Sequence, residues 1–151
     1  MLAMNEYSKA VFNDPKLLRE KLMFFLDAPD KVEIYAQSCE KFFQAGGKQR
    51  LGFCATWSWW AFIATFWFSL YRKDYLNALG AFIVEIFLVP LAMVVMGICG
   101  KYFVMKRFVT LLNLENDTIL TTSGGKNSWV IPVAIVLNIL VLFLLIIAEG
   151  L

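Results

Sequence analysis

Three long runs with almost no charged residues constrain this chain more than any other feature. The run 51–71 has no charge and is bracketed by two arginines, 76–100 has only Glu85, and 129–148 has none. A helix of 21 residues is about 31 Å long, close to the hydrocarbon thickness of a bilayer. The runs therefore predict an all-α integral membrane protein with three transmembrane helices, at about 51–71, 76–100 and 129–148.

The charged residues gather at the start of the chain. Overall 60% of the residues are hydrophobic, whereas before residue 51 there are eight Lys/Arg and seven Asp/Glu. This separation predicts a small water-facing domain over 1–50 and a membrane domain over 51–151. Basic residues are interleaved with acidic ones and the net charge is only +2, so we expect no nucleic-acid partner.

Residues 1–50 carry the signals of an amphipathic helical hairpin. Residues 13–15 (Asn-Asp-Pro) offer a capping side chain and a first-turn proline, residues 27–29 (Asp-Ala-Pro) interrupt the pattern, and residues 46–47 (Gly-Gly) end it. The apolar stripes of the two helices would pack on each other or on the membrane surface, or dock a partner protein. Because no basic segment followed by an apolar core begins the chain, we expect no cleavable signal peptide.

No pattern in the sequence points to catalysis, a metal or a cofactor. There is no histidine, and Cys39, Cys54 and Cys99 are too far apart for a CxxC motif. A zinc site and a histidine base are therefore not expected. Residues 124–126 (Gly-Gly-Lys) lack the upstream glycine of a P-loop. We expect neither an enzyme nor a cofactor.

The helix predicted over 51–71 has two distinct faces. The aromatic face comprises Phe53, Trp57, Trp60, Trp67 and Tyr71, and the small-residue face comprises Ser58, Ala61, Thr65 and Ser69. Small residues let helix backbones approach closely in lipid, so the second face should meet another helix. Aromatic residues favour the headgroup level, which predicts an aromatic belt, with a ligand-binding cage as the alternative.

Six residues are expected to anchor the chain at the two membrane interfaces. They are Trp60, Trp67, Tyr71, Arg72, Tyr75 and Trp129. Trp60 suits one interface, and Trp67 with Tyr71 suits the other. Arg72 would either snorkel to the interface or bind a lipid phosphate together with its tyrosine neighbours.

The distribution of basic residues predicts the orientation in the membrane. Three crossings put 1–50 and 101–128, with twelve Lys/Arg, on one side, which the positive-inside rule assigns to the cytoplasm. The C-terminus would then lie outside. Arg72 and Lys73 would also lie outside, against the rule, unless 51–71 is re-entrant or lies flat. A cysteine replacing Lys73 would react from outside the cell only in the first arrangement.

The most unusual residue is Glu85, because a charge inside the hydrocarbon costs at least about 2.5 kcal/mol. Asn138 lies near the middle of the last run, at nearly the same depth if both runs cross the membrane. We therefore expect the two side chains to face each other, with Glu85 in its neutral form. The pair would hold the helices together, contact another subunit, or take part in ion or proton movement.

The remaining signals concern the second run and the segment after it. Pro90 should kink the second crossing, while Gly97 and Gly100 thin one face near its end. A short amphipathic helix is expected over 104–116, followed by a polar loop up to Ser128.

Several of these segments resemble one family. The residues are Trp59-Trp60-Ala61-Phe62, Trp67, Tyr71-Arg72-Lys73 with Tyr75, Gly100-Lys101-Tyr102 followed by Lys106-Arg107, and Gly124-Gly125-Lys126-Asn127-Ser128-Trp129. Their order and spacing over 35–135 resemble the domain-of-unknown-function 2628 family of small bacterial inner-membrane proteins. The resemblance implies a helical fold in the bacterial inner membrane. It brings no known activity and no catalytic residue.

Together these features lead us to expect an accessory or scaffold subunit that acts through protein–protein contacts and touches membrane lipid. Its contact elements would be the N-terminal hairpin and the small-residue face. The alternative is a subunit of a homo-oligomeric transporter or channel centred on Glu85.

Overall fold

The computed structural model describes residues 2–150, except for the side chains of 142, 145 and 148–150. These residues form eight α-helices, which confirms the predicted all-α class. The helices are α1 (Glu6–Asn13), α2 (Pro15–Leu26), α3 (Val32–Ala45), α4 (Trp59–Tyr71), α5 (Tyr75–Phe87), α6 (Val89–Leu112), α7 (Asp117–Ser123) and α8 (Val130–Gly150). A 3₁₀ turn, η1 (Pro29–Lys31), precedes α3, and β1 (Leu2–Ala3) pairs antiparallel with β2 (Arg50–Leu51).

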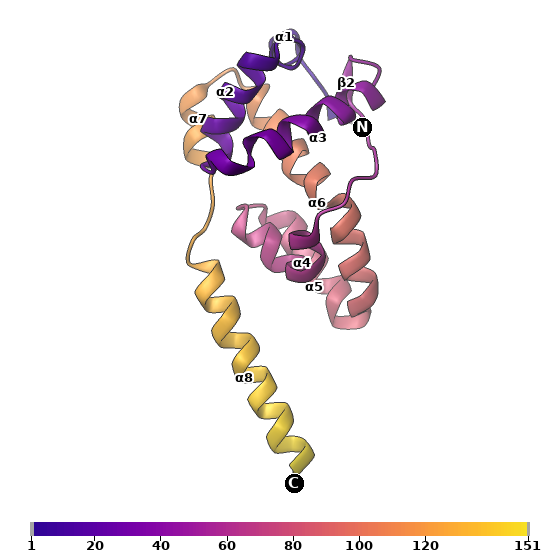
Figure 1. Ribbon diagram of the computed structural model, residues 1–151, viewed down its shortest axis with the longest axis vertical. Coiled ribbons are helices and arrows are strands. Elements are labelled where there is room, and N and C mark those ends of the chain that lie inside the picture. Colours follow the sequence, from indigo (N-terminus) through magenta and orange to yellow (C-terminus); the bar gives the residue numbers. More distant parts are fainter. Residues whose placement is uncertain (1, 151) are drawn as a thin grey trace.

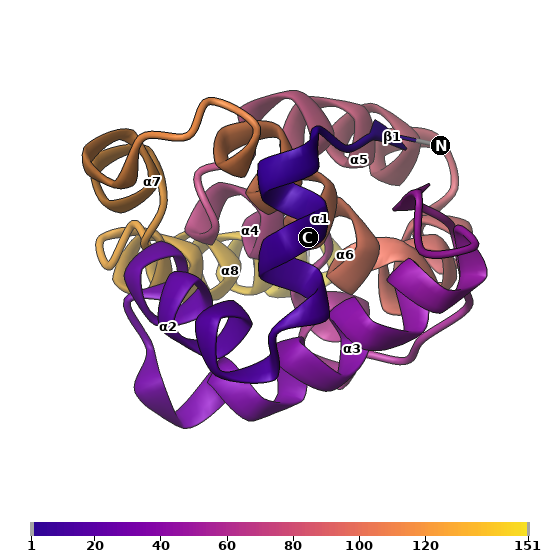
Figure 2. The same cartoon turned by 90° about the horizontal axis from the view of Figure 1, so that it is seen from above.

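The helices form a head, an apolar layer and a projecting arm (Figure 1). The head consists of α1, α2, α3, α7 and the second half of α6. The apolar layer contains α4, α5 and the first half of α6, and α8 extends beyond it. Viewed from above, the head helices surround the end of α6 (Figure 2).

The core of the head is built around α6. Met105, Phe108 and Leu112 of α6 are fully or almost fully buried among residues of α1, α2 and α3. The Phe108 ring lies 5.2 Å from that of Phe25 and 6.1 Å from that of Phe12. Residues 1–50 therefore do not close a core of their own, and the predicted separate domain includes part of the later chain.

The capping signals predicted in the first 50 residues are confirmed. Asp14 caps α2 by accepting hydrogen bonds from the backbone of Lys16 and Leu17, at 2.9 and 3.2 Å, and Pro15 opens the helix. Gly46 ends α3. Helix α1 was not predicted; it is capped by Asn5, whose side chain accepts a hydrogen bond from the Ser8 backbone at 2.8 Å.

The segment after residue 100 differs from prediction. The helix expected over 104–116 is the continuation of α6, and the expected polar loop contains α7. An ion pair holds α7 to α2, since Lys21 Nζ lies 2.6 Å from an Asp117 oxygen. A hydrophobic core residue, Leu120, completes this contact.

The prediction of one continuous helix over 51–71 is wrong. Residues 52–58 form no regular secondary structure, and α4 has only 13 residues, with a non-helical backbone at Thr65. The end of α4 lies beside the head, since Arg72 Nη1 donates to the Leu26 carbonyl at 3.2 Å. The start of α4 is held to the first half of α6, where the Ser58 backbone donates to the Gly97 carbonyl, and it lines a cleft shared with the head. A crossing would have separated Arg72 from the head by the thickness of a bilayer.

The run 76–100 is also not a single kinked helix. The chain breaks at Leu88, where the backbone leaves the helical region (φ −146°, ψ 69°), and α5 and α6 pack against each other on either side of the break. Pro90 lies in the first turn of α6, where proline is well tolerated, rather than at a kink. The start of α5 and the middle of α6 therefore both face the head.

Among the residues whose side chains are described, α6 is the one helix long and apolar enough to cross a membrane, judged by length and composition alone; α8 enters this comparison only as Val130–Val141. The apolar segments Tyr75–Phe87 and Val130–Val141 are shorter. Three crossings are therefore not confirmed. The second half of α6, moreover, packs in the core of the head.

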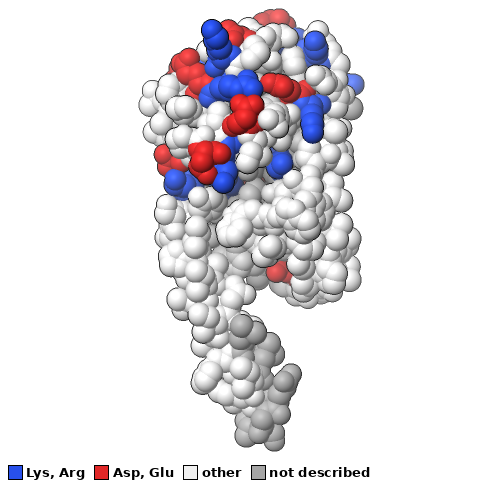
Figure 3. Space-filling model, in the orientation of Figure 1, with Lys and Arg blue, Asp and Glu red and all other residues white. Residues whose placement is uncertain are grey.

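Charged residues are separated from apolar ones in space as well as in sequence. On the face shown in Figure 3, nearly all Lys, Arg, Asp and Glu lie on the head, and the lower part is almost uncharged. The exposed surfaces of α5 and α8 consist largely of leucine, isoleucine, valine and phenylalanine. An apolar surface of this extent is typical of a protein that meets lipid or another protein.

The apolar layer depends on a close approach between α4 and α6. The small residues Ala61, Thr65 and Ser69 are buried, which confirms that this face meets another helix. A Cβ placed on Gly100 would lie 2.6 Å from the Cβ of Ala61, and one on Gly97 would lie 3.0 Å from the Trp57 ring. The glycines of α6 thus let the two backbones pack directly.

Gly100→Ala is expected to destabilise the protein because the added methyl group overlaps Ala61. A loss of about 1–3 kcal/mol in the free energy of unfolding is typical of such overpacking. Gly80→Ala in α5 is the matched control, since a Cβ there meets nothing within 4 Å. Thermal unfolding in detergent measures both variants. Equal stability of Gly100→Ala and the unmodified protein would contradict the packing described.

Candidate functional site

Glu85 pairs with Thr65 rather than with Asn138. The Thr65 hydroxyl donates to a Glu85 carboxyl oxygen at 2.6 Å, which joins α4 to α5. Asn138 donates instead to the Ala134 carbonyl of its own helix, at 2.7 Å, and its side chain is exposed. The predicted pair between Glu85 and Asn138 is therefore wrong, because its depth argument assumed that both runs cross the membrane.

Thr65 has an unusual backbone conformation as well as a polar partner. Its φ is 40° and its ψ is −115°, values that a β-branched residue rarely adopts. The residue is only 3% exposed. Strained backbone persists only where its surroundings hold it, and here the hydrogen bond to Glu85 and the packing of α4 on α6 provide that support.

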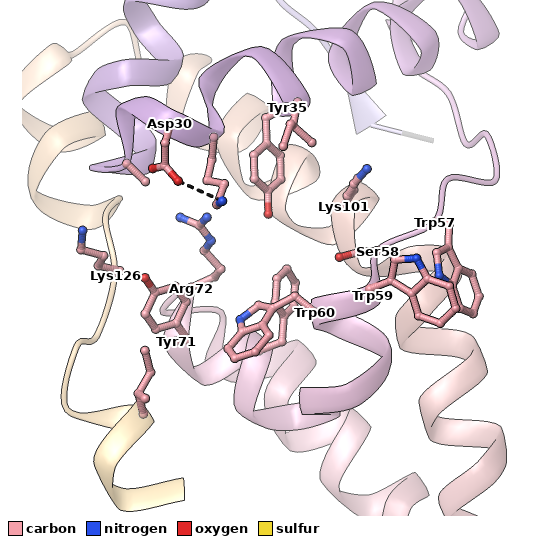
Figure 4. A pocket seen from close by; sticks show the side chains of 15 residues that line it. Asp30, Tyr35, Trp57, Ser58, Trp59, Trp60, Tyr71, Arg72, Lys101 and Lys126 are labelled. Carbon is pink, nitrogen blue, oxygen red and sulfur yellow. Dashed lines mark ion pairs between the residues drawn. The ribbon is translucent and has the colours of Figure 1, made fainter. Parts of the chain in front are cut away.

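A cleft of about 560 Å³ opens where the head meets the apolar layer (Figure 4). Its upper wall is the segment from η1 into α3, its lower wall is the two ends of α4, and α6 and α8 close the sides. The polar and aromatic residues that line it include Asp30, Lys31, Tyr35, Trp57, Trp59, Trp60, Tyr71, Arg72, Lys101 and Lys126. Four basic residues thus face one acidic residue.

Arg72 lies at the back of this cleft. Its guanidinium carbon is 5.3 Å from the ring centre of Tyr35 and 5.4 Å from that of Tyr71, within the range of cation–π attraction. One nitrogen donates to the Leu26 carbonyl, and Nε has no hydrogen-bond partner although it is buried. Among the described side chains, no carboxylate forms an ion pair with Arg72.

The loop before α8 fixes the end of α4 to the head. The Asn127 backbone donates to the Tyr71 carbonyl at 2.8 Å, and its side chain donates to the Leu70 carbonyl at 3.0 Å and the Tyr75 hydroxyl at 3.2 Å. Gly125, whose φ is +78°, donates to the Phe25 carbonyl. The segments 71–75 and 124–129, which are 50 residues apart in sequence, therefore form one side of the cleft.

The predicted anchors do not divide between two interfaces. Trp60, Tyr71 and Arg72 line the same cleft, and Tyr75 meets the loop that leads to Trp129. Trp60, Tyr75 and Trp129 are more than half exposed, as expected of interfacial aromatic residues. Trp67 is half-buried and packs against Phe66, with ring centres 4.5 Å apart.

Sequence reasoning missed three residues of the cleft: Lys31, Tyr35 and Lys101. Tyr35 looked like one member of an apolar stripe, and the two lysines looked like ordinary surface or helix-end charges. Only the return of α4 to the head brings them around Arg72, and no local pattern indicates that return.

The described residues contain no group of three or more His, Cys, Asp or Glu side chains that could hold a metal ion. The expectation that the protein has no cofactor stays a prediction.

Comparison of the chain with protein-family models, curated proteins and solved structures finds no match. The resemblance given above therefore stays a prediction based on the motif residues. Four of its segments, at 59–62, 71–75, 100–102 and 124–129, contribute to the cleft or its wall.

Substitutions at Glu85 test its hydrogen bond with Thr65. Glu85→Gln keeps an oxygen that can accept from the Thr65 hydroxyl, whereas Glu85→Leu leaves this buried hydroxyl without a partner. We expect the leucine variant to be less stable than the glutamine variant by about 1–3 kcal/mol, measured by unfolding in detergent.

The control is the same pair of substitutions in a Thr65→Val background. Removal of the hydroxyl should abolish most of the difference between leucine and glutamine. A difference that persists unchanged would show that Glu85 is held by other contacts.

Proposed function

We propose that this chain is a small membrane-embedded accessory subunit that acts through protein–protein contacts. In this proposal α8 crosses the bilayer, while α4, α5 and the first half of α6 enter and leave it on the side of the head. The continuous α8 over Val130–Gly150 would reach about 31 Å, enough for one crossing. The return of α4 to the head supports the re-entrant arrangement.

The positions of the basic residues support a cytoplasmic head. Arg72 contacts Leu26, Lys73 donates to the Thr122 carbonyl at 3.4 Å, and Lys126 donates to the Asp27 carbonyl at 2.8 Å. In the re-entrant arrangement no basic pair lies on the opposite side, so the positive-inside rule is obeyed throughout. The N-terminus would then be cytoplasmic, and the motif resemblance suggests the bacterial inner membrane.

The contact surface differs from the one expected at first. The small-residue face of α4 is already covered by α6, so it is not free to bind another protein. The arm α8 packs on α4 near its start, and its later described side chains are exposed and apolar apart from Asn138. A lone amide on an apolar helix favours association with another helix, because a hydrogen bond across the contact is strong in lipid. This observation carries the proposal.

A second candidate is a homo-oligomeric transporter or channel centred on Glu85. The observation that favours it is the strained break of α4 at Thr65, which hydrogen-bonds Glu85. Discontinuous helices next to an ionisable residue are a recurring feature of membrane ion sites. This candidate needs a closed assembly in which Glu85 meets water.

Recovery of a partner in detergent, with and without Asn138, tests the main proposal. The unmodified protein should co-purify with a second protein or a second copy, and Asn138→Leu should reduce recovery by roughly 3-fold to 15-fold, as expected for one interhelical hydrogen bond. Ile139→Leu, at a neighbouring exposed position of α8, is the control and should have no effect.

Equal recovery with Asn138→Leu would contradict a contact through α8. A closed homo-oligomer that is unaffected by Asn138→Leu but dissociates with Glu85→Gln would favour the second candidate.

A further inference from the structure

Arg72 is buried, and no described carboxylate forms an ion pair with it. The side chain is only 7% exposed, and its Nε is buried without a hydrogen-bond partner. Burying an arginine is unfavourable unless a partner offsets the lost hydration of its charge. The Leu26 carbonyl supplies one neutral acceptor, which leaves the positive charge uncompensated by any described carboxylate.

The nearby acidic residues are engaged elsewhere. Asp30 pairs with Lys31 at 2.9 Å, and Asp74 accepts from the backbone and side chain of Asn77 at the start of α5. Tyr35 faces Arg72 but is a phenol rather than an anion: burial raises its pKa, although the Arg72 charge opposes that shift. The carboxylates near the cleft therefore leave the positive charge of Arg72 unmatched.

A second basic residue without an ion pair among the described side chains, Lys101 of α6, makes the cleft a site for an anion rather than for a cation. Lys126 lines the opposite side of the cleft, where its Nζ lies 3.7 Å from an Asp27 carboxyl oxygen. Figure 4 shows Arg72 between these two lysines, with its guanidinium directed towards the head, beside the Asp30–Lys31 ion pair. A guanidinium with free N–H groups matches the oxygens of a phosphate in geometry and in charge.

The lower wall of the cleft is apolar, which indicates the kind of group that an anionic ligand would carry besides its charge. Trp60 is 52% exposed there, and Ile131 of α8 lines the same space. Below them the exposed surface continues with Ile63 on α4 and Ile135 on α8. A ligand that fits both parts carries an anionic group at one end and a hydrocarbon chain at the other.

We propose that this cleft binds an anionic membrane phospholipid, with the phosphate held by Arg72 and Lys101 and the acyl chains lying between α4 and α8. Trp57, Trp59 and Trp60 lie beside the headgroup, where amphipathic aromatic rings are favoured. The bound lipid supplies the negative charge that Arg72 lacks within the chain. Through this site, the stability of the contact between the head and the apolar layer would depend on the lipid composition of the membrane.

Quenching of tryptophan fluorescence by brominated lipids tests the proposal. The purified protein is placed in phosphatidylcholine vesicles that contain an equal fraction of either brominated phosphatidylglycerol or brominated phosphatidylcholine. Three of the five tryptophans line the cleft, so a lipid bound there quenches them. We expect a roughly ten-fold preference for phosphatidylglycerol, the equivalent of one charge-assisted hydrogen bond.

Three variants decide whether the preference comes from this cleft. Arg72→Gln and Lys101→Gln should reduce it to near unity, while Lys106→Gln, an exposed lysine further along α6, should leave it unchanged. If Arg72→Gln does not fold, Lys101→Gln alone decides. No preference in the unmodified protein, or equal effects of Lys101→Gln and Lys106→Gln, would overturn the proposal.

Inorganic phosphate distinguishes a lipid site from a site for a free anion. Millimolar phosphate should leave the phosphatidylglycerol preference intact, because it lacks the chains that contact α4 and α8. Complete loss of the preference would show that the site takes free phosphate and would overturn the lipid assignment.

The lipid site rests on the membrane location proposed above, and different results would contradict the site and the location. A protein that stays monodisperse without detergent would contradict the membrane location. A protein that requires lipid but shows no headgroup preference would contradict the cleft alone.

Discussion

The direct packing of α4 on α6 is the interaction on which the other parts depend. Gly100 allows Ala61 to touch the backbone of α6, and the same helix continues into the head, where Phe108 fills the core. Because one rigid helix serves both layers, it fixes the head at a set position above the apolar helices. The loop at 124–129 adds a second attachment through Asn127. The cleft around Arg72 exists because these two attachments hold the layers together at its sides.

Local signals predicted the helices of the head well, since caps and breaks depend on adjacent residues. Asp14 with Pro15 starts α2 and Gly46 ends α3, as expected. The apolar layer was predicted less well because hydrophobicity shows that a segment avoids water and not whether it crosses a membrane. The break at Thr65 occurs at a residue with no strong helix-breaking character, so nothing in the sequence marked it. The break at Leu88 was marked by Pro90, which was interpreted as a kink rather than as the first turn of a new helix.

The candidate sites were predicted incompletely for the same reason: their contacts depend on how the apolar segments fold back, which hydrophobicity does not show. Glu85 was expected to face Asn138, but its partner is Thr65, because α4 and α5 are neighbours and α8 leads away from them. For Arg72 the sequence left two expectations open, snorkelling to the interface or binding a lipid phosphate. Its burial between Tyr35 and Tyr71, and the lysines that join it, depend on contacts between segments far apart in the chain. The polar head, the apolar layer that returns to it and the cleft between them are the features behind the proposal of a protein that lies at one membrane surface and reaches through it with one helix.

The side of the membrane on which residue 73 lies tests this arrangement most directly. Lys73→Cys would be made in a variant without Cys54 and Cys99, since Cys39 is fully buried against Met105. A membrane-impermeant maleimide should label the new cysteine in inverted membrane vesicles and not in intact cells. Labelling from outside intact cells would mean that α4 crosses the bilayer, and would contradict the return of this helix to the head.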